Sequence, residues 1–131
     1  MSYTKFEYAD LEITDKLSSD QVVEVKVTIR NTGDVAGRET VQVYVSGPSD
    51  SSFKRVRKTL EGFVKTRSLQ PGESQEIVVR LPRRAFAVWS TEEQCWIVEK
   101  GEHQVQVARS SAVIEQVSAL RVDEEIRWTG I

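Results

Sequence analysis

The acidic side chains of this 131-residue chain gather most densely at two places, Glu92-Glu93 and Asp123-Glu124-Glu125. Acid–base catalysis by carboxyl groups needs two of them to face a substrate, with their pKa values pushed apart by different surroundings. Neighbours on an extended chain instead point to opposite faces, and nothing near either cluster indicates a pocket that would raise one pKa. The sequence therefore predicts solvated surface charge at both places and no catalytic residue.

The chain has one histidine, His103, and one cysteine, Cys95, which are too few for a zinc site of the usual composition. His103 also lacks the partners of a catalytic triad, so we expect an ordinary strand histidine. Cys95 begins an apolar run, and the neighbouring Glu92 and Glu93 would oppose a reactive thiolate. We therefore expect a buried thiol, no disulfide, no metal and no cofactor.

The most strongly charged stretch is the basic run Lys54-Arg55-Val56-Arg57-Lys58. Such a run could contact an acidic protein surface or nucleic-acid phosphates. The whole chain, however, has 18 basic and 20 acidic residues and a formal net charge of -2, so no global field would draw it to nucleic acid or to an anionic membrane. We favour a solvated loop or a protein contact, and we expect neither a nucleic-acid nor a membrane partner.

Large aromatic side chains are the remaining candidates for a binding role. Such rings usually belong to a core, but exposed rings in a row can stack on sugars. Rings that pack on a neighbouring domain would instead form an exposed apolar patch when that domain is absent. We expect burial for Trp96 and Phe63, and the sequence leaves Trp89, Trp128 and Phe53 open among these three roles.

Period-two alternation organises most of the chain. Valine and isoleucine alternate with polar residues over 23–30, and Val41, Val43 and Val45 share one face of a second strand. The turn at 31–34 ends the first strand, because Asn and Gly tolerate left-handed conformations. A short helical turn is expected within Arg83–Trp89, after Pro82 stops a strand. Further strands are expected at Phe6–Tyr8 with Leu11–Ile13, Leu60–Val64, Ile77–Leu81, Cys95–Val98, Gln104–Ala108 and Val117–Val122.

Seven or more short strands with regular turn signals predict an all-β fold. We expect a two-sheet antiparallel β-sandwich of fibronectin type III or immunoglobulin-like kind, with a closed barrel as the structural alternative. The Cys…Trp…Cys spacing of immunoglobulins is absent, which favours the fibronectin version. A single domain is expected over 1–131, with its core at about 5–122 and an extended tail over 123–131 that Trp128 anchors.

The order of short signatures along the chain is similar to that of one known family. It resembles the fibronectin type III-like C-terminal domain of family 3 glycoside hydrolases, the β-glucosidase family. His103, where an aromatic residue is common, and Ala108-Arg109, in place of a more usual glycine, depart from the pattern. The matching segments are Ser2–Phe6, Asn31-Thr32-Gly33, Val41–Val45 before Gly47-Pro48, Lys58–Phe63, Leu69–Ser74, Trp89, Trp96, Gly101–Ser111 and Trp128–Ile131.

The resemblance implies an accessory role. Members of the family carry their nucleophilic aspartate and their acid/base residue in two upstream domains, so no catalytic residue transfers to this chain. We therefore expect no enzymatic activity from the chain alone. The implied role is to dock on and stabilise the upstream catalytic domains of the same polypeptide, at the border of the substrate cleft. The expected docking or cleft-edge contacts are Phe53, Lys54, Arg55, Arg57, Trp89 and Trp128.

Two rival functions stay open at this stage. An independent carbohydrate-binding module for β-glucans or other polysaccharides would need coplanar exposed rings, and a stand-alone enzyme would need converging polar groups. The family's entry motif begins almost at Met1, so we expect an excised domain with a supplied start codon; a native transcript that starts at this methionine would contradict that. The single cysteine, with no glycosylation sequon and no signal segment, favours a reducing, cytoplasmic compartment for this stretch of chain.

Overall fold

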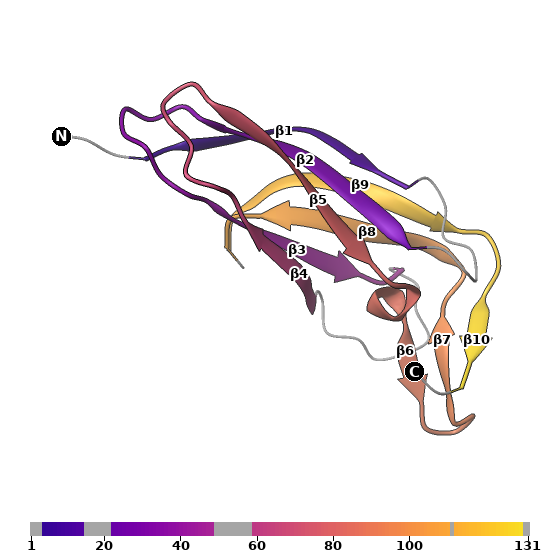
Figure 1. The fold of residues 1–131 in the computed structure, drawn as a ribbon. Coiled ribbons are helices and arrows are strands. Elements are labelled where there is room, and N and C mark those ends of the chain that lie inside the picture. Colours follow the sequence, from indigo (N-terminus) through magenta and orange to yellow (C-terminus); the bar gives the residue numbers. More distant parts are fainter. Residues whose placement is uncertain (1–3, 15–21, 49–58, 111, 130–131) are drawn as a thin grey trace.

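The computed structural model describes residues 4–14, 22–48, 59–110 and 112–129, which form an almost entirely β structure (Figure 1). No helix among these residues has the length and apolar character needed to cross a membrane. The elements in chain order are β1 (Phe6–Ile13), β2 (Val23–Asn31), β3 (Thr40–Ser46), β4 (Thr59–Lys65), β5 (Ser74–Leu81), the 3-10 helix η1 (Arg83–Phe86), β6 (Val88–Ser90), β7 (Cys95–Val98), β8 (Gly101–Ala108), β9 (Ile114–Val122) and β10 (Ile126–Trp128).

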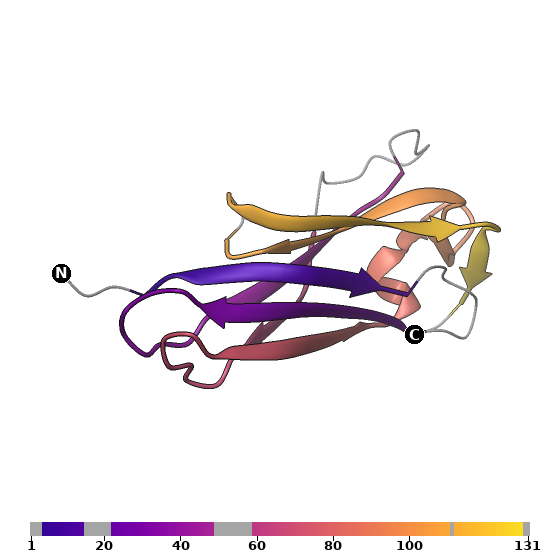
Figure 2. The ribbon, with the colours of Figure 1, turned by 90° about the horizontal axis from the view of Figure 1, so that it is seen from above.

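Two antiparallel sheets make up the main part of the molecule. One has the strand order β1-β2-β5 and the other β4-β3-β8-β9. The sheets lie face to face as two layers (Figure 2), and they approach each other along two edges, β1 against β9 and β4 against β5. This arrangement confirms the predicted two-sheet antiparallel sandwich of fibronectin type III type. We call these seven strands the body.

The core of the body is aliphatic because alternate residues of its strands point inward. The inward positions of β2 and β3 are the valines and the isoleucine that the sequence pattern singled out. The core cluster comprises Phe6, Tyr8, Val23, Val25, Val27, Ile29, Val41, Val43, Val45, Leu69, Ile77, Val79, Leu81, Phe86, Val98, Val105, Val107, Leu120 and Val122.

The turn after β2 is built by the side chain of Asn31, which is completely buried. Its Nδ2 donates hydrogen bonds to the carbonyl oxygens of Val35 at 2.9 Å and Leu69 at 2.7 Å, and its Oδ1 accepts one from the Gly33 amide at 2.9 Å. Among the described residues, the glycines with a left-handed φ are Gly72 and Gly101, at 87° and 129°. The strand therefore ends where the sequence predicted, but the side chain of Asn31 makes the turn and not a left-handed glycine.

A third, three-stranded sheet of order β10-β7-β6 projects beyond one end of the body (Figure 1). We call it the small sheet. The predicted helical turn after Pro82 is η1, which leads into it. Its third strand, β10, lies in the segment expected to be an extended tail, and it pairs with β7 from Ile126 opposite Val98 to Trp128 opposite Trp96.

Candidate functional site

All three tryptophans of the chain lie in one row across the small sheet, with Trp89, Trp96 and Trp128 at paired positions of its strands. The rings of Trp89 and Trp96 meet edge to face, with centroids 5.2 Å apart and planes at 69°. Trp96 and Trp128 are stacked, with centroids 6.4 Å apart and planes at 22°. The rings therefore pack on one another instead of forming a flat platform, and Trp89, 43% exposed, presents the most surface.

Two arginines of η1 cover this row. The guanidinium carbon of Arg83 lies 4.0 Å from the ring centroid of Trp128, and that of Arg84 lies 5.8 Å from the ring centroid of Trp96. Cations at these distances are attracted to the face of an indole ring. The arginines thus fasten η1 to the small sheet, and the tryptophans already have partners within the chain.

The two acidic clusters of the sequence meet at Arg127 of β10. Its Nη1 lies 2.5 Å from Glu93 Oε2 and its Nε lies 2.6 Å from Glu125 Oε2, and all three side chains are exposed. The hydrogen bonds that Arg127 donates, first to Glu125 and then to Glu93, raise its pKa. The carboxylates share one guanidinium at the surface, which is an ion-pair network and not the buried, unequal pair that acid–base catalysis needs.

His103 and Cys95 are both buried, and for the thiol this confirms the prediction from its apolar neighbours. His103 Nε2 lies 2.9 Å from the carbonyl oxygen of Glu99, and because a carbonyl can only accept, this nitrogen carries the proton. The ring also meets Phe86 edge-on, with centroids 5.9 Å apart. Within the described ranges, no three His, Cys, Asp or Glu side chains gather as a possible metal site.

The outcome for the remaining predicted residues is mixed. Phe53, Lys54, Arg55 and Arg57 lie outside the described residues. Trp96 is half-buried. The prediction that Phe63 is buried was wrong, since its side chain is 69% exposed.

Phe63 is exposed because successive side chains of β4 point to opposite faces of the sheet, and Phe63 occupies an outward position. Gly62 takes the inward position, where a Cβ atom would lie only 3.0 Å from Val79 Cγ1 of the opposite sheet. Val64 packs against the core on the same side, so Phe63 between them points outward. The glycine was visible in the sequence, and the close approach of the two sheets that requires it was not.

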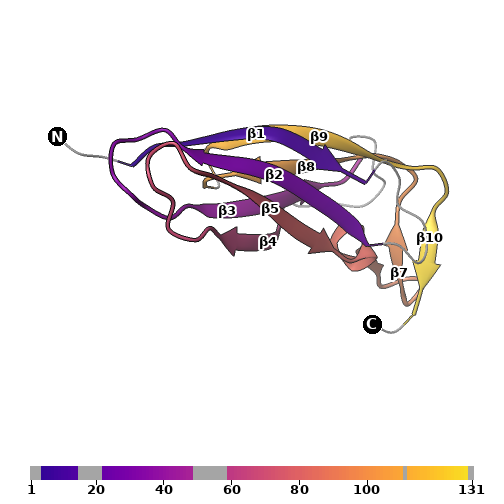
Figure 3. The ribbon, with the colours of Figure 1, turned by 45° about the horizontal axis from the view of Figure 1, so that its top comes forward.

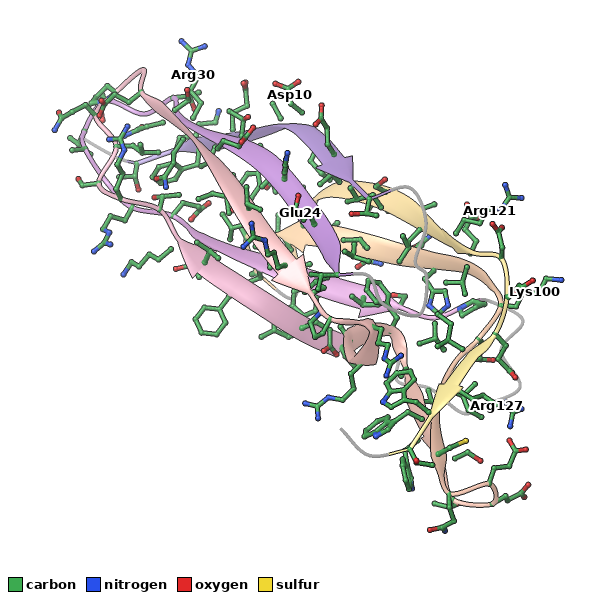
Figure 4. The ribbon with its side chains drawn as sticks, turned by 45° about the vertical axis from the view of Figure 1, so that its right-hand side comes forward. Asp10, Glu24, Arg30, Lys100, Arg121 and Arg127 are labelled. Atoms are coloured by element: carbon green, nitrogen blue, oxygen red, sulfur yellow. The ribbon has the colours of Figure 1, made fainter. Side chains whose placement is uncertain are left out.

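The outward faces of the two sheets of the body differ sharply in charge. Every cross-strand row on the outer side of β1-β2-β5 holds a charged residue (Figure 4, where Asp10, Glu24 and Arg30 are labelled). Arg80 Nε pairs there with Glu24 Oε2 at 3.1 Å. We call this side the charged face. Its outward rows are Glu7–Arg30–Ser74, Ala9–Thr28–Glu76, Glu12–Lys26–Val78 and Glu24–Arg80.

The outer side of β4-β3-β8-β9 has no charged residue in its three central rows. Figure 3 shows β2 and β5 of one sheet lying over β3 and β8 of the other, so the outer sides of the two sheets are on opposite sides of the body. We call these three rows the uncharged face. Its rows are Phe63–Gln42–Ala108, Leu60–Tyr44–Gln106–Val117 and Ser46–Gln104–Ala119.

Comparisons with a family model and with known proteins agree on one family. A family model described as a fibronectin type III-like domain matches residues 39–111. Thermostable beta-glucosidase B of Acetivibrio thermocellus is 39% identical over 128 residues, which are 97% of this chain and 17% of that protein. A beta-glucosidase of Kluyveromyces marxianus is 38% identical over 133 residues, covering 100% of this chain and 15% of that protein.

Solved structures of the same kind superpose closely. Beta-glucosidase 3B of Thermotoga neapolitana, in complex with alpha-D-glucose, matches with a TM-score of 0.88 and 38% identity over 99% of this chain and 17% of that one. The GH3 beta-glucosidase of Bifidobacterium adolescentis matches with a TM-score of 0.84 and 39% identity, over 94% of this chain and 18% of that one. The chain thus spans about a sixth of the length of these relatives.

Proposed function

Because this chain belongs to the fibronectin type III-like domains found in family 3 β-glucosidases, we propose that it is a non-catalytic accessory domain that docks on and stabilises the catalytic part of such an enzyme. The parent polypeptide in this proposal hydrolyses β-glucosides. The catalytic groups of the parent would then lie in the part of the relatives that this chain does not cover.

One observation carries the proposal: nearly the whole chain aligns with only 15–17% of the length of the β-glucosidases. A unit that recurs inside much longer enzymes, and whose described residues bring no acidic pair together in a buried site, is best explained as a supporting domain. Fold likeness alone would not carry this step, since one sandwich fold serves many functions.

Independent carbohydrate binding has less support. Sugar platforms need exposed rings in one plane, whereas Trp89 stands at 69° to Trp96 and Trp96 is covered by Trp128. The aromatic groups of the small sheet are therefore occupied with their own packing.

The decisive experiment is to identify the native polypeptide that carries this sequence. Its peptides are located by mass spectrometry in fractions from the source cells, and the fractions are assayed with p-nitrophenyl β-glucoside. We expect a polypeptide several times longer than 131 residues that co-purifies with β-glucosidase activity. A native chain of about this length, without that activity, would contradict the proposal.

A further inference from the structure

The contrast between the two outer faces of the body calls for a physical explanation. A sheet face that is exposed to water usually carries polar and charged residues, and the charged face has this composition. The uncharged face instead exposes Phe63 at 69%, Val117 at 54% and Leu60 at 50%. Between them lie amide side chains and Tyr44, whose hydroxyl donates to Gln42 Oε1 at 2.6 Å. Few charged residues together with exposed aromatic and apolar side chains are typical of the centre of a protein–protein interface.

Resting on the accessory role proposed above, we propose that the uncharged face is the surface on which the catalytic part of the parent polypeptide packs. The partner surface has matching chemistry: apolar groups opposite Phe63, Leu60 and Val117, and uncharged hydrogen-bonding groups opposite the glutamines. A charged partner would lose its hydration there without gaining a counter-charge.

The size of the face suits this role. Four strands about 4.8 Å apart and about five residues of about 3.3 Å rise give roughly 320 Å² per side. The total of about 640 Å² lies at the lower end of the range of interfaces between domains of one chain, which is about 600–1,500 Å². Because the partner is tethered to the same chain, its effective concentration reaches about the millimolar range, so a modest interface suffices.

The edges of the face supply the polar rim that such interfaces have. Beyond the last uncharged row, Glu102 of β8 lies opposite Arg121 of β9, and a half-open hollow lined by both extends to Lys100 and Asp123. Lys65 continues β4 past the opposite end. Within the face, the exposed Glu61 lies in β4 at the register shift between Leu60 and Gly62, where it accepts a hydrogen bond from Thr59. Otherwise charge returns where the uncharged rows stop.

Other occupants fit the face less well. A sugar needs ring faces to stack on, but Tyr44 is only 8% exposed, which leaves Phe63 as the only freely exposed ring in the rows. A second copy of the chain would have to associate from free solution, without the tether. The relatives supply instead a covalently linked partner that makes up the other 83–85% of their length.

Hydroxyl-radical footprinting with mass spectrometry tests the assignment residue by residue. The oxidation rates of Phe63 and Leu60 are compared between the 131-residue chain and the full parent polypeptide. We expect both rates to fall about fivefold or more in the parent, because interface centres are almost fully buried. Val78 on the charged face, 40% exposed in the chain, is the internal control and keeps its rate.

The other outcomes separate this inference from the accessory role itself. Protection of Trp89 without protection of Phe63 would overturn the uncharged face as the docking surface and leave docking intact. No protection anywhere in the domain would overturn docking as well. Protection of Phe63 in the isolated chain that rises with its concentration, or on addition of cello-oligosaccharide, would assign the face to a second copy or to a sugar and contradict the proposal.

Two matched substitutions sharpen the test. Val117→Lys and Val78→Lys each place a lysine at an exposed, outward valine of a strand, one on each face. In the full parent, Val117→Lys is expected to restore the oxidation of Phe63 toward its rate in the isolated chain, and Val78→Lys to leave it unchanged. Equal effects of the two variants would overturn the assignment. The footprint of the unmodified parent decides the question even if a variant folds poorly.

Discussion

The body and the small sheet are both antiparallel β structure, yet they are held together in different ways. The body encloses an aliphatic core between two sheets. The strands of the small sheet have only three, four and three residues, and its prominent contacts are stacked tryptophans, arginines over their rings and exposed ion pairs. Two or three short strands are marginal in water without a core to pack on. The small sheet therefore depends on the body, whereas the body need not depend on the small sheet.

This dependence can be measured because the two regions carry separate probes. All three tryptophans lie in the small sheet, so tryptophan fluorescence reports its unfolding, including the loss of the contact between Trp128 and the core cluster. Far-UV circular dichroism reports mainly the strands of the body. Coincident transitions by both probes mean one cooperative unit, and separated transitions mean two.

The largest effect is expected from Ile29→Ala in the body. Ile29 is fully buried in the central strand β2, and truncating such a residue costs about 2–5 kcal/mol, because lost burial adds to the cavity left behind. In urea unfolding, both the dichroism and the fluorescence midpoints should fall together. A fluorescence midpoint that stays in place would show a small sheet that is stable without the body.

Ile97→Ala is the matched substitution in the small sheet. Ile97 is also fully buried, but it lies outside the aliphatic core cluster. We expect a loss of about 2 kcal/mol, the low end of the range, because three short strands can relax around the cavity. The fluorescence midpoint should fall below the dichroism midpoint. Coincident fluorescence and dichroism midpoints in this variant would contradict the conclusion that the small sheet can unfold while the body stays folded.

The same division decides how much could be predicted from the sequence. Alternation at 23–30 and 41–45 predicted the body because its strands are long enough to show a period. Of the small sheet, the strand β7 was predicted at its observed bounds, but β6 and β10 were not. Three-residue strands show no period, and β10 finds its partner β7 about thirty residues away. The exposure of Phe63 was missed because the alternation of side chains along β4 is set by the inward position of Gly62, which only the packing of the two sheets fixes. The uncharged face was visible as Gln42, Gln104 and Gln106 at outward positions, but only the register joins them into a surface.

Tyr8 provides a pH-dependent contrast within the body. Burial, and then the carboxylate of Glu39, raise the pKa of Tyr8 well above its ordinary value of 10.0, and its hydroxyl donates to Glu39 Oε2 at 2.9 Å. Above pH 10 the unfolded chain therefore releases a proton that the folded chain keeps, so the free energy of unfolding falls as pH rises. The loss is at most about 1.4 kcal/mol for each pH unit.

The Tyr8→Phe variant isolates this effect. It should lose about 1 kcal/mol at neutral pH with the hydrogen bond, and the gap to the unmodified chain should close between about pH 10 and pH 11. The dichroism midpoint in urea, measured at both pH values, checks it. A gap that stays constant across this range would show that the hydroxyl ionises normally in the folded state.

The smallest effect is expected from Arg127→Gln in the small sheet. Arg127 joins Glu93 of the β6–β7 turn to Glu125 ahead of β10, but all three groups are exposed to water, where ion pairs gain little. The fluorescence midpoint should fall slightly at low ionic strength, and the difference should vanish near about 1 M salt, where charges are screened over about 3 Å. Arg121→Gln, which removes the looser pair with Asp123 at 3.4 Å, is the control and should not move the fluorescence. A large fall of the fluorescence midpoint in Arg127→Gln that salt does not reduce would contradict this prediction. It would mean that the ion pairs of Arg127, more than the packing of the tryptophan row, hold β10 in the small sheet.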